Sequence, residues 1–505
     1  MGLINSVLKF FLQQRMMDIQ KMMDNPVDYQ LLTFHDLVRK AKDTEWGRKY
    51  GYKDNLSLKT FQSRVPISTY EQLFPYIERM LKGEQNILWH SHIAWFSKSS
   101  GTTNDRSKFI PVSSEALEDC HNKGGKDMLA LFFNNFNAES KVFDGKTLSI
   151  GGTHTQNPYN AETRVGDVSA VVVENLPVWA EFARAPDKEI FMLTKWEDKI
   201  DKMVKATASE DITSLSGVPT WMVVVLQRML EHTGKNSMIE VWPNLEIFLH
   251  GAVSFVPYRE LVDKLIGSPN FMYQELYTAS EGFFAVQDLK GADDMLLLLD
   301  HGVFYEFIPL EDMVNEHPKT LTIDQVELYK NYALVISTNA GLWRYLIGDT
   351  IKFTSIKPYR IKITGRTKHF INAFGEELMV ENADFAIAKA CLQTNAVLKD
   401  YTAAPVYLQK GKQGCHEWLI EFEVKPTSID TFIEVLDKTL REINSDYDAK
   451  RYNDIALCMP IVTTLPQGTF YNWLKTKNKL GGQNKIPRLS NSRTHVEDIT
   501  EMIVR

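Results

Sequence analysis

The sequence predicts an α/β protein in which a large N-terminal domain holds mixed, largely parallel sheets and an antiparallel β subdomain, followed by a smaller C-terminal α+β domain. Three observations predict this class. The chain has 505 residues, which is long for one domain and leaves room for a large core. Strand and helix patterns alternate after Trp95. From about residue 300, strand follows strand with short links, which favours an antiparallel sheet.

Residues 1 to about 90 are expected to be helical. In "FHDLVRKAKDTEWGRKYGY", Phe34, Leu37 and Ala41 recur at helical spacing, and Gly51 supplies a stop.

The alternating region that follows predicts the parallel core. The segments read as strands are "KTLSIGG" (146–152), "DVSAVVVENL" (167–176) and "NLEIFLHGAVS" (244–254). The segments read as helices are "TWMVVVLQRMLEHTG" (220–234), which ends at Gly234, and "ELVDKLIG" (260–267). The antiparallel strands expected after them are 302–310, 332–338, 342–353 and 359–366.

Residues 379 to 505 return to a mixed order. Helices are expected in 381–393 and 430–443, around strands such as 417–425. The seam between the two parts is placed in "TGRTKHFINAFGEE", near Lys368. The predicted domains are therefore residues 1–368 and 369–505.

Composition excludes several classes of protein. Apolar residues make up 44%, charged residues 24%, and the net charge is −7, without a basic tract that would suggest nucleic-acid binding. Four cysteines in 505 residues are too sparse for a disulfide scaffold, so a reducing, cytoplasmic compartment is expected. No apolar run reaches about 18 residues, and no membrane span or membrane partner is predicted.

A short stretch rich in small hydroxyl residues, "WFSKSSGTTNDRSKFIPVS" (95–113), is a candidate phosphate site. Gly101 allows positive φ, so a ligand can approach the backbone closely. Successive amides and hydroxyls can form a nest for phosphate oxygens, and Lys108 adds a positive charge; the hydroxyls come from Ser99, Ser100, Thr102 and Thr103. The Walker pattern is absent, and a plain polar surface loop is the alternative.

Three further segments carry candidate functional side chains. Glu281, in "ELYTASEGFFAV", follows a predicted strand among small and aromatic residues, where Mg²⁺ beside a triphosphate is a natural partner. Asp349, in "GLWRYLIGDTIKF", is expected at a turn after a strand and either caps that turn or accepts two ribose hydroxyls. Lys485, in "NKLGGQNKIPRLS", either faces solvent or belongs to a mobile element that closes over phosphates.

The order of these motifs resembles the auxin-responsive acyl-acid amido synthetase family of plants and bacteria, within the adenylate-forming (acyl-CoA synthetase and firefly luciferase-like) superfamily. The similarity runs from "AKDTEWGRKY" to "QNKIPR". "SSGTTNDRSK" is similar to the phosphate loop, "YTASE" to the Tyr-x-x-Ser-Glu motif and "AGLWRYLIGD" to the Tyr-x-x-Gly-Asp motif. "GGQNKIPR" resembles the segment with the late lysine, and "GRTKHFINAFGEEL" resembles the interdomain hinge, with Lys368 at its pivot.

The resemblance implies a ligase that uses ATP and Mg²⁺. A small carboxylic acid would be adenylated with release of pyrophosphate, and an amine, expected to be an amino acid, would then displace AMP. Lys485 and Glu281 would be catalytic, with Glu281 also holding the metal. The residues implied in ATP binding are Ser99, Ser100, Gly101, Thr102, Thr103, Lys108, Ala252, Val253, Tyr277, Thr278, Ser280, Asp349 and Arg366.

For the acyl group, the resemblance implies a wall at Val218, Pro219 and Trp221, although these residues equally suit the core at a helix start. A hinge at Lys368 would swing the smaller domain between the two half-reactions. The chain is expected to act as a monomer on small-molecule substrates.

Two rival functions stay open. An acyl-CoA ligase would share the adenylation step and transfer the acyl group to a thiol. A nucleotide-binding protein without catalysis, with Asp105 and Leu346 as marks of decay, would bind ATP and do nothing further.

Overall fold

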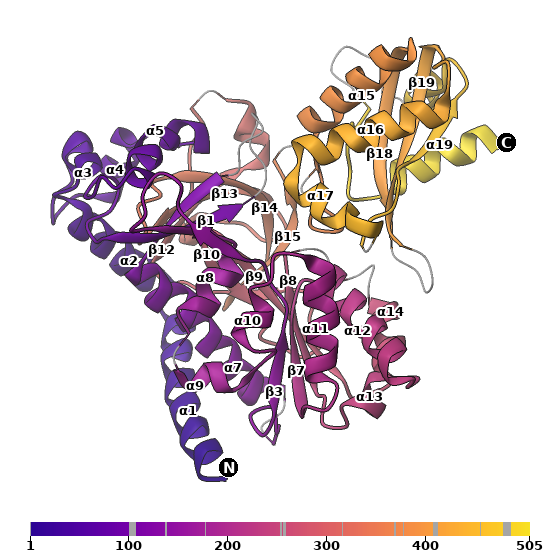
Figure 1. The fold of residues 1–505 in the computed structure, drawn as a ribbon. Helices are drawn as coiled ribbons and strands as arrows, with labels where there is room; N and C mark the ends of the chain where they lie inside the picture. Colours follow the sequence, from indigo (N-terminus) through magenta and orange to yellow (C-terminus); the bar gives the residue numbers. More distant parts are fainter. Residues whose placement is uncertain are drawn as a thin grey trace.

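The computed structural model consists of a large lobe and a smaller lobe that sits on one side of it (Figure 1). The smaller lobe is built from the C-terminal part of the chain, and the N-terminal helix α1 runs along the far side of the large lobe (Figure 1). The structure describes residues 2–504 except 100–107, 137–138, 177, 253–254, 256–258, 316, 368–369, 377, 408–412, 455 and 478–485.

The expected N-terminal helices are present, and they pack on one end of the large lobe. Their bounds are α1 Gly2–Asp24, α2 Pro26–Ala41, α3 Glu45–Tyr50, α4 Leu58–Arg64 and α5 Tyr70–Leu81. Phe34, Leu37 and Ala41 are buried along α2, and Gly51 ends α3 with φ 69°. The helical period therefore identified the face of α2 that packs on the core.

A network of buried charges anchors α1 to the large lobe. Arg15 Nε lies 2.5 Å from Asp127 Oδ1, and Arg15 Nη2 lies 3.0 Å from Asp300 Oδ2. Lys123 Nζ lies 2.7 Å from Asp300 Oδ2, and His301 Nε2 lies 2.9 Å from Asp127 Oδ2.

In the described part of the chain, eleven strands form one sheet in the order β12-β13-β14-β15-β11-β10-β9-β8-β7-β3-β6. The strands from β9 to β6 pair in parallel, and those from β9 to β12 pair antiparallel. The bounds are β3 Lys146–Ser149, β6 Arg184–Ala185, β7 Ile212–Gly217, β8 Ile247–Gly251, β9 Met272–Ala279, β10 Gly282–Val286, β11 Met295–Leu297, β12 Val303–Pro309, β13 Asn331–Thr338, β14 Tyr345–Ile356 and β15 Tyr359–Arg366. The predicted mixed α/β class is confirmed, with the antiparallel strands extending the parallel sheet.

A second sheet, of order β2-β1-β5-β4, lies beside the first. Its strands are β1 Ile93–Ser99, β2 Lys108–Ser113, β4 His154–Gln156 and β5 Arg164–Gly166. After β2 the chain turns into α6 Ser114–Ala116, a π-helical turn Leu117–Asn122, and α7 Lys123–Asn135.

Helices that cover the parallel half complete the large lobe. Their bounds are α8 Val168–Glu174, α9 Val178–Phe182, α10 Lys188–Phe191, α11 Trp196–Thr207, α12 Pro219–Thr233, α13 Met238–Val241 and α14 Arg259–Ile266, with short 3₁₀ turns at Leu310–Val314 and Ile323–Gln325. The predicted strand 167–176 is wrong, because this segment forms α8. Three consecutive valines favour a strand, but Ala170 and Val171 are buried on one side of a helix that begins after Asp167.

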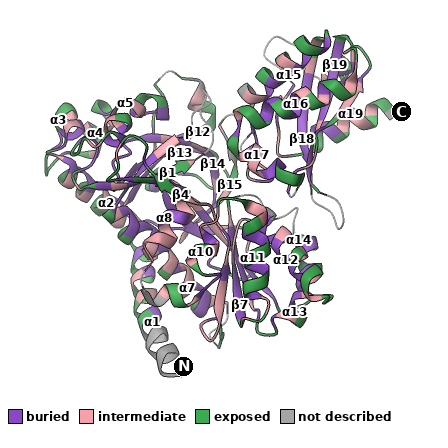
Figure 2. Cartoon of the chain, in the orientation of Figure 1, coloured by how far each residue is buried: buried purple, intermediate pink, exposed green. Residues whose placement is uncertain are grey.

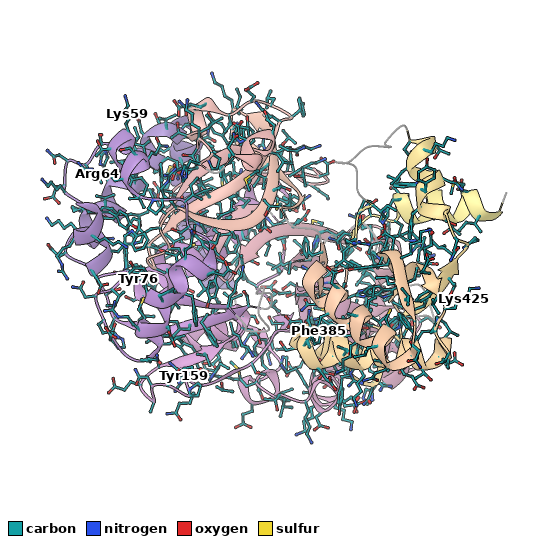
Figure 3. All side chains as sticks on the ribbon, turned by 90° about the horizontal axis from the view of Figure 1, so that it is seen from above. Lys59, Arg64, Tyr76, Tyr159, Phe385 and Lys425 are labelled. Carbon is teal, nitrogen blue, oxygen red and sulfur yellow. The ribbon has the colours of Figure 1, made fainter. Side chains whose placement is uncertain are left out.

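The smaller lobe carries a three-stranded sheet, β18-β19-β20, beside the short pair β16-β17. The bounds are β16 Phe370–Ile371, β17 Leu378–Met379, α15 Val380–Thr394, β18 Val397–Val406, β19 Cys415–Val424, α16 Ile429–Ile443, α17 Ser445–Arg451, a 3₁₀ turn Tyr452–Asp454, β20 Ile461–Leu465, α18 Thr469–Thr476 and α19 Thr494–Val504. Seen from above, Phe385 and Lys425 lie on this lobe, across from Tyr76 and Tyr159 on the large lobe (Figure 3).

Burial is concentrated in the sheets of both lobes (Figure 2). One apolar cluster joins the N-terminal helices to the antiparallel half of the large sheet, and another runs from the parallel half into the smaller lobe. None of the described helices is long and apolar enough to cross a bilayer. The four cysteines are unbonded.

Candidate functional site

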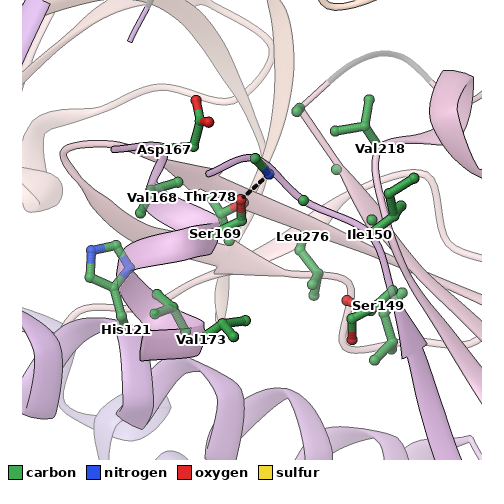
Figure 4. Close-up of a pocket in the computed structure, with 18 of the residues that line it drawn as sticks. His121, Ser149, Ile150, Asp167, Val168, Ser169, Val173, Val218, Leu276 and Thr278 are labelled. Carbon is green, nitrogen blue, oxygen red and sulfur yellow. Dashed lines mark hydrogen bonds between the residues drawn. The ribbon is translucent and has the colours of Figure 1, made fainter. Parts of the chain in front are cut away.

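A cavity of about 1060 Å³ opens where the parallel strands end, and both lobes contribute to its lining. Gly217, Gly251 and Thr278, at or near the carboxyl ends of β7, β8 and β9, lie along it. Ligands in open α/β sheets bind at this edge of the sheet. Figure 4 shows labelled residues around the cavity that come from distant parts of the chain, among them His121 and Leu276.

Ser99 and Lys108 lie side by side at the ends of β1 and β2, where they are paired in the antiparallel register. Lys108 Nζ donates to the hydroxyl of Tyr345 at 3.4 Å and lies 5.9 Å from the ring centroid of Tyr70. Burial raises the pKa of Tyr70, and the negative charge of Glu281 adds to the rise. Lys108 and Glu281, 173 positions apart in the sequence, therefore approach the same tyrosine.

Tyr277 and Asp349 form a direct hydrogen bond. The Tyr277 hydroxyl donates to Asp349 Oδ2 at 2.6 Å, and both residues are buried. The prediction of a turn at Asp349 is wrong, because the residue lies inside β14, directly after Gly348 with φ 99°. Asp349 pairs with Arg366 across β14 and β15, so the two residues predicted to hold the ribose are neighbours in the sheet.

The segment from Thr278 to Glu281 forms the end of β9 and the turn into β10. Thr278 and Ser280 line the cavity, and Glu281 sits half-buried in the turn. Ala252, directly after β8, also lines the cavity and has φ 70°. Positive φ is uncommon for a residue with a Cβ and is often held at a binding site.

The three residues predicted for the acyl wall separate into two groups. Val218 and Trp221 line the cavity, whereas Pro219 is buried as the first residue of α12 and is not part of the lining. Trp221 stacks face to face on Trp196, with ring centroids 4.0 Å apart. Val218 and Trp221 therefore belong both to the start of α12 and to the wall of the cavity.

Several predicted site residues lie outside the described part of the structure. They are Ser100, Gly101, Thr102, Thr103, Val253, Lys368 and Lys485. The backbone of Arg366 is described, and its side chain is not.

The cavity also contains residues that were not predicted from the sequence. His121 faces it from the π-helical turn, and burial, with a smaller contribution from His301, lowers the pKa of His121 to about 4, so this histidine is neutral near pH 7. Gly152 donates its backbone N–H to the Ser169 hydroxyl at 3.0 Å, the dashed line in Figure 4. The predicted strand 146–152 included the Gly-Gly pair at 151–152, whereas β3 ends at Ser149, and this pair is the sequence signal that could have indicated the turn. Nothing in the sequence pointed to Lys450, which reaches the cavity from the smaller lobe.

A second place where metal-ligating side chains gather is the cluster of Asp127, Asp300 and His301. The guanidinium of Arg15 and the ammonium of Lys123 already neutralise these carboxylates. Glu281 is thus the better candidate for Mg²⁺, since this ion is commonly held by one or two carboxylates together with the phosphates of a nucleotide.

The arrangement can bring a nucleotide and an acyl group together. Cationic and hydroxyl groups lie at the ends of β1 and β2, and a buried carboxylate lies on β14. Leu129, Phe132 and Leu249 supply an apolar wall deeper in the cavity. A cavity lined by both polar and apolar groups suits a molecule with a charged end and a hydrophobic body.

Comparison with known proteins places the chain in a family. Models of the GH3 family match residues 15–271 (N-terminal domain), 296–366 (central domain) and 381–494 (C-terminal domain). The indole-3-acetic acid-amido synthetase GH3.3 of Arabidopsis thaliana is 22% identical, over 93% of this chain and 90% of the relative. The probable indole-3-acetic acid-amido synthetase GH3.1 of the same plant is 22% identical, over 96% of this chain and 93% of the relative.

Solved structures share the fold. The GH3.15 acyl acid amido synthetase superposes with a TM-score of 0.61 at 16% identity, covering 96% of this chain and 94% of that protein. A 2-hydroxyisobutyryl-CoA ligase bound to 2-HIB-AMP and CoA superposes with a TM-score of 0.56 at 12% identity, covering 94% and 91%. The three family matches follow one another in order along most of the sequence, and the chain belongs to the GH3 family.

Proposed function

We propose that this protein is an ATP-dependent ligase that adenylates a small carboxylic acid and transfers the acyl group to an amino acid. The products are an amide, AMP and pyrophosphate. The observation that carries this proposal is the cavity itself, which is bordered by residues of the Tyr-x-x-Ser-Glu motif at one side and by the smaller lobe at the other. The named relatives are amido synthetases, which supports the same reaction class.

The first half-reaction brings two anions together, a carboxylate and a triphosphate, so the site must supply positive charge and hydrogen-bond donors. Lys108, Lys485 and the amides of residues 99–103 would do so. Bound Mg²⁺, held by Glu281, would neutralise phosphate charge. Asp349 would accept the ribose hydroxyls with help from Arg366, and Tyr277 and residues 252–253 would flank the adenine.

The second half-reaction needs a different set of groups at the same place. We propose that residues 1–368 form the fixed domain and 369–505 the moving one, with the pivot at Lys368. Rotation of the moving domain would take Lys485 away from the cavity and bring up a surface that admits the amine. Closure of this domain over the cavity would keep water from hydrolysing the acyl-adenylate. We further propose a monomer working in the cytoplasm, a compartment that suits four unbonded cysteines.

A product analysis tests this function. The protein is incubated with ATP, Mg²⁺ and a panel of carboxylic acids, together with either the twenty amino acids or CoA, and the products are identified by mass spectrometry. The proposal predicts an amide and AMP with at least one acid and amino acid. A thioester formed with CoA in place of an amide would establish the acyl-CoA ligase, and binding of ATP without AMP release would establish a non-catalytic nucleotide-binding protein.

A further inference from the structure

Lys450 is a buried cation that the mechanism above does not use. It lies on α17, on the side of the smaller lobe that faces the large lobe (Figure 1), and its side chain lines the cavity. The residue is only 8% exposed. Its Nζ forms neither a hydrogen bond nor an ion pair with any described residue.

One contact of this ammonium group is aromatic. Lys450 Nζ lies 4.5 Å from the ring centroid of Trp221, a residue of the large lobe. Trp221 stacks on Trp196, and a second lysine lies over the Trp196 ring. Lys199 Nζ is 4.7 Å from the centroid of that ring. Lys199 donates a hydrogen bond to the carbonyl of Gly151 at 2.8 Å, so this buried lysine has a polar partner, whereas Lys450 has none in the described part of the chain.

Three acidic residues lie near Lys450, namely Asp446, Glu376 and Asp167. Asp446 stands one helical turn before Lys450 on α17 and also lines the cavity, but no hydrogen bond or ion pair joins it to Lys450 in the described part of the chain. Glu376 accepts hydrogen bonds from the Phe374 amide and from His416 Nε2. Asp167 accepts a hydrogen bond from the Thr153 amide at 2.9 Å. A cation–π contact recovers only part of the hydration that a buried ammonium loses. A buried cation that borders a cavity and has no charged partner among the described residues is therefore a candidate for binding an anionic group of a ligand.

A glycine lies next to the head group of Lys450. Gly375 has φ 86°, and a Cβ at this position would lie 3.4 Å from Lys450 Nζ. Both residues line the cavity, so the residue beside the ammonium group contributes no side chain to it.

We propose that Lys450 binds the α-carboxylate of the amino acid acceptor and thereby selects amino acids over simple amines. This assignment rests on the proposed function. The carboxylate of the acid substrate is consumed in adenylation. During acyl transfer the acyl-adenylate keeps its negative charge on the phosphate, and the amino acid brings the free carboxylate. A single ammonium suits one carboxylate, whereas the phosphates of CoA would need several cations.

In the step that Lys450 assists, the unprotonated amine attacks the carbonyl carbon of the acyl-adenylate. A C–N bond forms, the bond from the carbonyl carbon to the phosphate oxygen breaks, and AMP leaves with the electron pair. The proton lost by nitrogen passes to the solvent. Lys450 binds the carboxylate of the amino acid, so that the amine approaches the carbonyl carbon from the smaller lobe. Lys450 takes no part in bond making and is therefore a positioning residue.

The test uses Lys450→Met and Lys450→Arg, with Lys438→Met as the matched control. Lys438 is on α16 of the same lobe, its side chain is 76% exposed, and it does not line the cavity. Acyl transfer is measured with the best amino acid acceptor and with the amine that its decarboxylation would give. Acid-dependent ATP–pyrophosphate exchange and the melting temperature are measured on every variant.

Lys450→Met is expected to raise the KM for the amino acid about 10- to 100-fold, as befits the loss of a charged hydrogen bond. The KM for the decarboxylated amine, the exchange reaction and the melting temperature should stay unchanged, and Lys450→Arg and Lys438→Met should resemble the wild type. Equal effects on both amines, or no effect on either, would overturn the assignment while leaving the proposed function intact. A raised KM for the acid in the exchange assay would assign Lys450 to the acyl donor instead. A wild-type protein without acid-dependent exchange would refute the proposed function itself, and with it this role.

Discussion

Asp349 is the side chain on which nucleotide binding is expected to depend most. It is 6% exposed and is held by the Tyr277 hydroxyl at 2.6 Å. Asp349→Asn keeps the shape and removes the charge, and the KM for ATP should rise about 10- to 100-fold, because hydrogen bonds to a charged group are among the strong ones. The measurement is the ATP dependence of pyrophosphate exchange.

Tyr277→Phe is the control for this substitution, since it removes the group that orients Asp349 and leaves the carboxylate in place. A rise of about 2- to 10-fold is expected, in line with the loss of one neutral donor. If Asp349→Asn folds normally and binds ATP as the wild type does, Asp349 does not hold the ribose.

Lys450 gives the second half-reaction a characteristic pH dependence. Burial lowers the pKa of Lys450 to about 8, although the charges of Asp446, Glu376 and Asp167 oppose the shift. The ammonium is therefore present below pH 8 and is lost as the pH rises through this value, and with it the attraction for a carboxylate. Lys450→Arg stays charged throughout, because the guanidinium pKa lies above 12.

The ratio of the KM for the amino acid in the wild type to that in Lys450→Arg should accordingly rise about tenfold for each pH unit above 8. Taking the ratio removes the titration of the amino acid itself, which affects both proteins equally. A ratio that stays constant between pH 7 and pH 10 would contradict the role of Lys450.

Helix α7 contains two neighbouring glycines with opposite surroundings. A Cβ at Gly124 would lie 2.4 Å from Cγ of Phe283, whereas a Cβ at Gly125 would meet nothing within 4 Å. Gly124→Ala should lower the free energy of unfolding by about 1–3 kcal/mol through overpacking. Gly125→Ala should raise it by about 0.5–1 kcal/mol, since alanine is the better helix former.

Urea unfolding of both variants measures this difference, and the two substitutions serve as controls for each other. Gly125 also lines the cavity, so a larger residue there should exclude bulky acids before it affects stability. Equal destabilisation by both alanines would mean that the α7 backbone is packed differently from this structure.

Helices and strands could be predicted from the sequence wherever a local signal agreed with the packing. Gly234 ends α12 in the left-handed conformation, as expected of a glycine after a helical period. The prediction of a strand over residues 167–176 failed, because β-branched side chains suit both a strand and a helix that is buried on one side, and residues 168–174 form α8. Asp349 was placed in a turn because Gly-Asp is a common turn pair, but Gly348 provides the irregular backbone within a strand.

The cavity could be predicted only in part, because it depends on which distant segments meet. The motif at residues 277–281, at the end of β9, includes Thr278 and Ser280, which line the cavity. His121 and Lys450 carry no local pattern, and a lone histidine or lysine is ordinarily structural or solvated. Only the folded structure places both at the cavity, because residues of both lobes line it.

The two lobes together are expected to separate the half-reactions by domain rotation. Lys485→Ala should slow adenylation and spare the transfer of a supplied acyl-adenylate to the amine, because the lysine is needed only while phosphate charge is neutralised. Rapid-quench measurement of both steps checks this expectation. Equal losses in the two steps would contradict the rotation and place Lys485 permanently in the site.

Every role proposed for the cavity depends on adenylate formation there. Acid-dependent exchange of labelled pyrophosphate into ATP, without any amine present, measures this step. Exchange should require Mg²⁺ and a carboxylic acid and should fall sharply in Asp349→Asn. ATP binding with no exchange for any acid across a broad panel would show that the protein forms no adenylate.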